Sequence, residues 1–346
     1  MTSDSYFLRY LWFVTILVIG LALVRPSFGA SMSADFEAFQ AAPHGTVSVT
    51  RQNQIDQFSY LFIGGYGNEF GRDHYFQWNV EMLAEMGAGS VRTFFPSSLK
   101  AAGANLAEVR EQIVRSYRDS GGRPVVVMGH SKGGLETLAT LLKYPELVTE
   151  GIVANAILIQ APVGGNTLLD QRGLLGRLYA KALSLPAEAF RSLRTPGINA
   201  IVAERIEELT DSKAELRAVS RVVRYVISHK EVEDSGAGIR LASQFLPHKI
   251  PNDGLVAKID MWIPGFGTIL GDLYIDHLEV MLGKSVRFVA DNVERARVRA
   301  FTKSLILNLM KSRNPDNREY RQLTEIATAR RTGAPLKCEL LFLPAM

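Results

Sequence analysis

The chain contains 346 residues, of which 47% are hydrophobic and 21% are charged, and this composition is typical of a globular protein with a sizeable core. The length allows one large domain with extensions or two small domains. Cys338 is the only cysteine, which excludes an intramolecular disulfide and a cysteine-based metal site. The net charge of +4 is modest and uneven, because residues 284–331 hold 12 Lys and Arg against 5 Asp and Glu. The basic character therefore belongs to the C-terminal region.

The first 30 residues have the layout of an export signal. Residues 10–24 form an uncharged run of 15 residues between Arg9 and Arg25, and small residues follow it. This run is shorter than the ~20 residues that a spanning helix prefers. Residues 1–30 are therefore predicted to be a signal peptide, with a retained N-terminal membrane anchor as the competing interpretation. Both interpretations predict an exported protein, periplasmic or secreted, whose body lies outside the cytoplasm.

The body that follows alternates between strand and helix patterns, which predicts an α/β fold with a mostly parallel sheet and helices on both faces. Residues 167–216 interrupt this alternation with helical segments, which fit either a lid over the site or helices packed on the sheet. The predicted strands are 46–50, 58–63, 90–95, 125–128, 152–159, 222–228 and about 273–275, and the predicted helices include 77–86, 105–117 and the segment after residue 131.

One turn in this body carries a reactive side chain. The strand at 125–128 stops at Gly129, and Gly129-His130-Ser131-Lys132-Gly133 leads directly into a helix whose leucines recur at helical spacing. A serine at such a junction lies on a strained bend with its hydroxyl exposed. The flanking glycines are expected because side chains there would collide with the neighbouring strand and helix.

Three separated segments resemble the α/β-hydrolases and, among them, the bacterial lipases. They are the Gly-x-Ser-x-Gly turn at 129–133, Asn252-Asp-Gly-Leu-Val256 and Asp276-His-Leu-Glu-Val280, in the order that this fold requires. The resemblance covers about residues 58–282. It implies an α/β-hydrolase domain at 31–283 with a helical cap at about 167–216, followed by a basic helical C-terminal extension at 284–346.

The resemblance also implies a catalytic triad. A serine needs a base within hydrogen-bond reach, and that base needs an orienting carboxylate. The chain order in this fold is serine, acid, histidine, and His277 is the only histidine after Asp253. We therefore expect Ser131 to be the nucleophile, His277 the general base and then acid, and Asp253 the orienting acid. Asp170 is the rival acid, because some lipases carry the acid after the preceding strand.

The resemblance also implies two backbone N–H groups that bind the negatively charged oxygen, or oxyanion, which forms when the serine attacks a carbonyl group. One follows the nucleophile, at Lys132, and the other lies in the loop after the strand at 58–63, at Tyr66 or alternatively at Gly65. The family often has His-Gly in this loop, where this chain has Gly64-Gly65. The Lys132 side chain is expected in solvent, and His130 is expected to pack beneath the turn. We interpret two further histidines, His229 and His248, as ordinary loop residues.

The residue pattern of the C-terminal region predicts one long helix at 285–311 with basic and apolar faces. Such a helix can contact an anionic membrane surface, but packing on the core with a solvated basic face is the favoured alternative. The sequence has no phosphate-binding loop, no dinucleotide-binding glycine pattern and no His-Glu-x-x-His zinc motif, and no cofactor or metal is expected. A nucleic-acid partner is not expected for an exported chain.

These features predict a serine esterase or lipase that cleaves a carboxylic ester through an acyl-enzyme intermediate. The export signal, the apolar loops and the predicted lid favour lipid-like esters as substrates. An acyltransferase of the same fold would share the triad. A catalytically silent, membrane-tethered binding protein on the same scaffold is the alternative from a different class.

Overall fold

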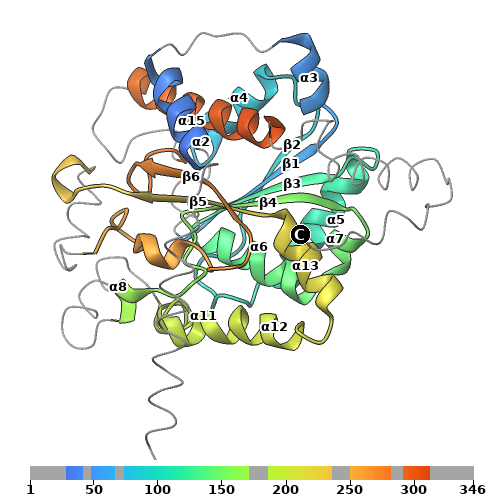
Figure 1. Cartoon of the computed structure of the whole chain (residues 1–346), viewed down its shortest axis with the longest axis vertical. Helices are drawn as coiled ribbons and strands as arrows, with labels where there is room; N and C mark the ends of the chain where they lie inside the picture. The colour runs from blue at the N-terminus through green and yellow to red at the C-terminus, as the bar shows by residue number, and fades with distance from the viewer. Residues whose placement is uncertain are drawn as a thin grey trace, which may run out of the picture.

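The computed structural model describes residues 29–41, 48–66, 74–170, 186–235, 250–281 and 291–311. Within these residues a six-stranded sheet has the order β2-β1-β3-β4-β5-β6, and every neighbouring pair of strands is parallel. Figure 1 shows the sheet between two layers of helices, as the sequence predicted. The strands are β1 (Ser59–Ile63), β2 (Val91–Phe94), β3 (Val125–His130), β4 (Val153–Ile159), β5 (Val223–His229) and β6 (Thr268–Tyr274).

The central strands are buried on both faces, because their side chains alternate between two apolar clusters. In β3, Val125 and Val127 pack into one cluster, whereas Val126 and Met128 pack into the other. A parallel strand that is covered on both faces has a continuous apolar sequence, and this pattern made the central strands recognisable. Strand β6 begins at Thr268, earlier than the strand expected at about 273–275. The sequence pattern missed its first residues because exposed residues interrupt its apolar run.

Each face of the sheet has its own set of helices (Figure 1). The first apolar cluster includes residues of α5 (Leu106–Asp119), α6 (Lys132–Lys143), α7 (Glu146–Thr149) and α13 (Lys213–Val222). The second includes residues of α2 (Gly29–Ala41), α3 (Val49–Ile55), α4 (Gln77–Glu85) and α15 (Asp291–Lys311). Two short 3-10 turns, η2 (Val232–Asp234) and η3 (Lys258–Met261), lie in the connection from β5 to β6.

The short strand expected at 46–50 is wrong for the part that the structure describes. Helix α3 begins at Val49, and the hydroxyl of Ser48 caps it by accepting a hydrogen bond from the Arg51 N–H at 3.4 Å. A serine at this position satisfies a backbone donor that the first helical turn leaves without a partner. Residues 46 and 47 lie outside the described residues.

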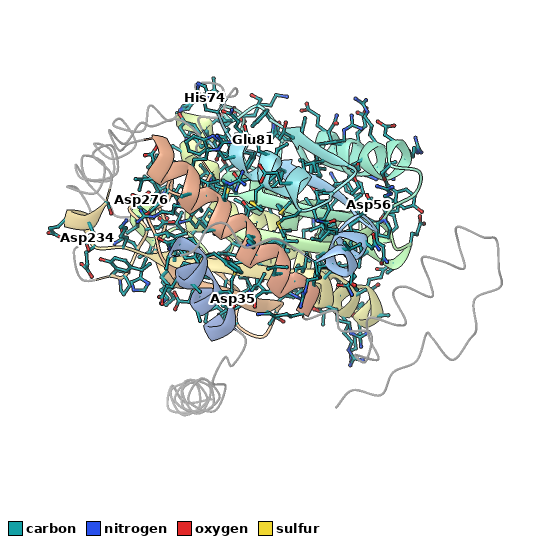
Figure 2. The ribbon with its side chains drawn as sticks, turned by 90° about the horizontal axis from the view of Figure 1, so that it is seen from above. Asp35, Asp56, His74, Glu81, Asp234 and Asp276 are labelled. Carbon is teal, nitrogen blue, oxygen red and sulfur yellow. The ribbon has the colours of Figure 1, made fainter. Side chains whose placement is uncertain are left out.

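Helix α15 packs on the sheet layer, which is the alternative that the sequence favoured. Phe301, Leu305 and Ile306 are buried in the second cluster. Two of its basic residues pair with carboxylates of α4, Arg295 with Glu81 at 2.9 Å and Arg299 with Glu85. Figure 2 shows α15 crossing the molecule with Asp35 of α2 near its C-terminal end, where Asn308 Nδ2 and Lys311 Nζ donate to the Asp35 carboxylate.

Most predictions for the two ends of the chain concern residues that the structure does not describe. Positions 1–28 and 312–346 lie outside the described residues, as do residues 282–290, which precede α15. Among the residues that the structure describes, no helix has both the length and the apolar character needed to cross a bilayer.

The helical interruption after β4 is confirmed where it is described. It contains α8 (Thr167–Asp170), α10 (Ala187–Ser192), α11 (Thr195–Ile201) and α12 (Ala203–Glu208). Leu193, Ile198 and Val202 of this region are buried in the same apolar cluster as the sheet. These helices therefore pack on the body of the protein, and residues 171–185, where the leucine-rich face of the predicted cap lies, are outside the described residues.

The start of α6 lies so close to the end of β1 that a methyl group would not fit between them. A Cβ atom at Gly133 would lie 2.4 Å from Ile63 O and 2.5 Å from Gly64 O. Both neighbours are backbone atoms, so Gly133→Ala should lower the free energy of unfolding by about 3 kcal/mol. Urea unfolding measures this loss. Gly121→Asn is the matched control, because a Cβ atom there meets nothing within 4 Å and asparagine tolerates its φ of 75°. Equal losses in the two variants would contradict the argument from close approach.

Candidate active site

The strand order places a crevice at the carboxyl ends of β1 and β3. The chain runs outward from β1 to β2 and then returns to the other side of β1 to form β3. In parallel sheets, ligands bind at such a reversal, because the loops that follow the two strands diverge there. The loop after β1 carries Gly64 and Gly65, and the turn after β3 carries Ser131.

Ser131 occupies a strained backbone conformation at this crevice. Its φ is 54° and its ψ is −126°, in a region that residues with a side chain rarely adopt. The turn is held by the hydrogen bond from Ser131 N to Ile159 O at 2.9 Å. A Cβ atom at Gly129 would lie 2.6 Å from the Gly133 carbonyl oxygen. The expected strand–turn–helix junction and the expected need for flanking glycines are both observed.

His277 is oriented by a buried carboxylate. Its Nδ1 lies 2.7 Å from Asp253 Oδ2, and its backbone N–H donates to Asp253 O at 2.9 Å. The other carboxylate oxygen accepts hydrogen bonds from Leu255 N at 3.0 Å and Val256 N at 2.8 Å. Both side chains are almost completely buried. Because the carboxylate accepts the Nδ1 proton, Nε2 is the nitrogen that is left to act as a base.

The rival acid has other partners. Asp170 Oδ1 accepts a hydrogen bond from Thr195 N at 3.1 Å and lies 3.3 Å from the Arg194 guanidinium. The structure thus brings Asp253, and not Asp170, to His277. The expectation that His229 lies in a loop is wrong, because it is the last residue of β5, 3.6 Å from Asp272 and about one-third exposed. His248 lies outside the described residues.

Ser131 and His277 line the same cleft. Within the described residues no hydrogen bond joins the Ser131 hydroxyl to the His277 ring. Such bonds between nucleophile and base are often long before substrate binds. The walls of the cleft are mostly apolar, and the residues that line it include Tyr66, Pro162, Asn166, Leu169, Leu193, Leu255, Val256 and Leu278.

Of the two candidates for the first oxyanion donor, Tyr66 lines the cleft. The Gly65 N–H donates to the Tyr75 hydroxyl at 3.3 Å. A Cβ atom at Gly65 would lie 2.8 Å from both His130 O and Ser131 Cβ, which explains why glycine occupies the position. The Lys132 N–H begins α6 and has no acceptor among the described residues, as an oxyanion donor requires.

The expectation that the Lys132 side chain lies in solvent is wrong. Its ammonium is buried and donates to three carbonyl oxygens, those of Ser97 at 3.1 Å, Ser98 at 3.2 Å and Lys100 at 2.8 Å. It also pairs with Glu136, one helical turn further along α6, at 3.3 Å. Burial raises the pKa of the Glu136 carboxyl to about 7, although the Lys132 charge opposes this shift. Lys132 therefore fixes the loop that follows β2.

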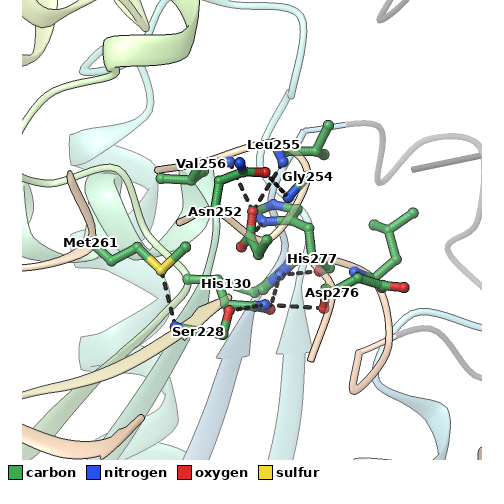
Figure 3. A network of polar contacts seen from close by, with 12 residues as sticks. His130, Ser228, Asn252, Gly254, Leu255, Val256, Met261, Asp276 and His277 are labelled. Atoms are coloured by element: carbon green, nitrogen blue, oxygen red, sulfur yellow. Dashed lines mark hydrogen bonds and ion pairs between the residues drawn. The ribbon is translucent and has the colours of Figure 1, made fainter. Parts of the chain in front are cut away.

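His130 packs beneath the turn, as expected, but with partners that the sequence did not indicate. Its Nδ1 lies 2.5 Å from the Tyr75 hydroxyl, and its Nε2 lies 3.0 Å from the carbonyl oxygen of His277. Gln160 Oε1 lies 3.3 Å from the same Nε2. Figure 3 shows His130 below His277, with Ser228 and Asp276 nearby. Among the described residues, no group of histidine, cysteine and acidic side chains could hold a metal ion.

Comparisons with known proteins identify the fold. No family model matches the sequence, and no curated protein is significantly similar to it. A metagenomic carboxyl esterase has a TM-score of 0.56 at 22% identity, and the match covers 77% of each chain. The phospholipase PlaB from Legionella pneumophila has a TM-score of 0.52 at 14% identity, and the match covers 80% of this chain and 64% of that one. A Bacillus licheniformis lipase has a TM-score of 0.49 at 19% identity, with 63% and 84% covered. Together with the sheet topology, the first two show that the chain has the α/β-hydrolase fold.

Substitutions can test whether Asp253 or Asp170 is the acid that orients His277. Asp253→Asn should lower kcat for a p-nitrophenyl ester on the order of 10³- to 10⁴-fold, because an amide no longer holds His277 in the required tautomer. Asp170→Asn is the matched control and should leave kcat close to that of the wild type, since Asp170 pairs with Arg194. Steady-state kinetics measures both values. A large loss in Asp170→Asn with an active Asp253→Asn would reverse the assignment.

Glu136 should make stability depend on pH. Its pKa of about 7 in the folded chain exceeds its usual value of 4.5, so the folded state binds the proton more tightly. The resulting stabilisation is present below pH 4.5 and is lost as pH rises to 7. Glu136→Gln removes this titration. Between pH 4 and 8, the free energy of unfolding measured in urea should fall by about 3 kcal/mol more for the wild type than for the variant. Glu111→Gln, an exposed α5 residue, is the control and should follow the wild type. Parallel curves for wild type and Glu136→Gln would contradict the shift.

Proposed function

We propose that the protein is a serine ester hydrolase in which Ser131, His277 and Asp253 form the catalytic triad. The main support is one observation: His277, whose Nδ1 lies 2.7 Å from Oδ2 of the buried Asp253, lines the same cleft as Ser131. The strained turn at Ser131 supports its role as nucleophile. Two structures that this chain resembles with TM-scores above 0.5 are a carboxyl esterase and a phospholipase, which supports an ester as the substrate.

Acylation begins when Ser131 Oγ attacks the carbonyl carbon of the ester. His277 Nε2 takes the hydroxyl proton, and the carbonyl electron pair moves to the oxygen, which accepts hydrogen bonds from the N–H groups of Lys132 and Tyr66. When the carbonyl re-forms, the bond to the alcohol oxygen breaks and His277 gives that oxygen its proton. Water then repeats the sequence on the acyl-enzyme and releases the carboxylic acid.

Asp253 supports each of these steps through its charge. His277 becomes positively charged whenever it holds the serine or water proton, and the carboxylate 2.7 Å from Nδ1 stabilises that charge. Its second oxygen accepts hydrogen bonds from two backbone N–H groups, which hold the carboxylate in place. Substrate binding is expected to bring Ser131 Oγ into hydrogen-bond contact with His277 Nε2.

The substrate that fits this cleft best is an ester with an apolar acyl group. Leu169, Leu193, Leu255, Val256 and Leu278 line the cleft and can exclude water from an acyl chain. Lipid-like esters are therefore the proposed class of substrate. The proposed location remains outside the cytoplasm, with residues 1–30 acting as a signal or an anchor, and contact with a membrane surface would bring such substrates to the cleft.

A fluorophosphonate probe tests whether the protein is an enzyme. The probe reacts with an activated serine, so it should label the wild type and not Ser131→Ala. Ser120→Ala is the matched control, because Ser120 ends α5 away from the cleft, and it should be labelled like the wild type. Labelling should be accompanied by hydrolysis of p-nitrophenyl esters, with higher kcat/KM for long acyl chains than for short ones. A folded wild type that takes up no probe would instead be the catalytically silent binding protein.

A further inference from the structure

A continuous series of hydrogen bonds runs below the nucleophile from the loop after β1 to the loop that carries His277. It starts at the Gly65 N–H, which donates to the Tyr75 hydroxyl at 3.3 Å. The hydroxyl lies 2.5 Å from His130 Nδ1, and His130 Nε2 lies 3.0 Å from the His277 carbonyl oxygen. Tyr75 and His130 are both buried. The series therefore connects the proposed oxyanion loop with the proposed base through groups that are shielded from water.

The direction of each hydrogen bond follows from the groups at its two ends. A backbone N–H can only donate, so the Tyr75 oxygen accepts from Gly65 and its own proton goes to His130 Nδ1. His130 Nε2 must then carry the ring proton, because both of its neighbours, the His277 carbonyl and Gln160 Oε1, are acceptors. Burial lowers the pKa of His130 well below its usual value, and the nearby His277 ring adds to this effect. His130 is therefore neutral, in the Nε2–H form.

Gln160 extends the network to a second carbonyl of the His277 loop. Its amide nitrogen donates to the Ser228 hydroxyl at 2.7 Å and to the Asp276 carbonyl at 3.1 Å. Gln160 is fully buried and has a φ of 51°, which is a strained conformation for a residue with a side chain. Such strain persists only where the surroundings fix it, and it concentrates at functional sites. Here it accompanies a side chain that holds three separate elements.

We propose that Tyr75, His130 and Gln160 are positioning residues that set the distance between the oxyanion loop and the catalytic base on either side of Ser131. They hold the two consecutive carbonyls of residues 276 and 277 and the N–H of Gly65, the neighbour of the proposed donor Tyr66. The proposal rests on the proposed hydrolase function. Its consequence is kinetic: loosening the series should slow the chemical step, because transition-state contacts require this distance, and should leave substrate binding nearly unchanged.

The test removes one hydroxyl. Tyr75→Phe deletes the donor to His130 Nδ1 and the acceptor of the Gly65 N–H, and it keeps the ring. We expect kcat for a p-nitrophenyl ester to fall on the order of 10- to 100-fold with KM changed less than about twofold. Tyr225→Phe is the matched control, because Tyr225 is also a buried tyrosine and its hydroxyl lies outside this series. That variant should keep the kcat of the wild type, and Tm is measured for both.

Two further measurements keep the proposal open to contradiction if Tyr75→Phe folds poorly. Gln160→Met keeps the length of the side chain and removes its amide, and it should also lower kcat more than KM. In the wild type, ¹⁵N NMR of the imidazole nitrogens should report neutral His130 with its proton on Nε2. A proton on Nδ1, or wild-type kcat in folded Tyr75→Phe and Gln160→Met, would overturn the positioning role. Absence of fluorophosphonate labelling in the wild type would instead overturn the hydrolase function itself.

Discussion

The position of the nucleophile depends on how closely helix α6 approaches the end of strand β1. Gly133 lies against the carbonyl oxygens of Ile63 and Gly64, and Gly129 lies against the first turn of the same helix. These contacts constrain the backbone on both sides of the turn after β3, and Ser131 has a φ of 54° there. The same approach brings the loop after β1 next to the helix start, so that Tyr66 and the Lys132 N–H reach one cleft. Close packing of backbone against backbone thus creates both halves of the proposed site.

The loop of the proposed base is held by buried polar groups on several sides. Asp253 binds both the ring and the backbone N–H of His277. Just beyond, Glu279 accepts the Asp276 N–H at 3.0 Å and pairs with Lys230 at 2.8 Å and with Arg297 of α15. Burying a charge is costly unless it is paired, and these charges are paired. The arrangement favours a single geometry of the loop over a set of similar ones.

The sequence revealed those features that depend on local pattern and missed those that depend on distant partners. The buried strands and the turn at Ser131 were predictable because periodicity and glycine spacing are local properties. Asp253 and His277 were recognisable from the segments around them. The burial of Lys132 was not, because its acceptors are the carbonyl oxygens of residues 97–100 in another loop. Tyr75 and Gln160 carried no signal either, since their partners lie 55 and 30 residues away, on His130.

Helix α2 and helix α15 come from opposite ends of the described chain, yet they form one layer. Phe36 and Phe301 meet edge to face with their centroids 6.3 Å apart, and the Ser33 hydroxyl donates to Asp272 O, 239 residues away. During synthesis, helix α2 therefore leaves the ribosome long before its partners exist. At about 5–20 residues per second, the delay is roughly 10 to 50 s. Over that interval the side chains of Met32 and Phe36, which are buried in the folded chain, cannot yet pack against α15.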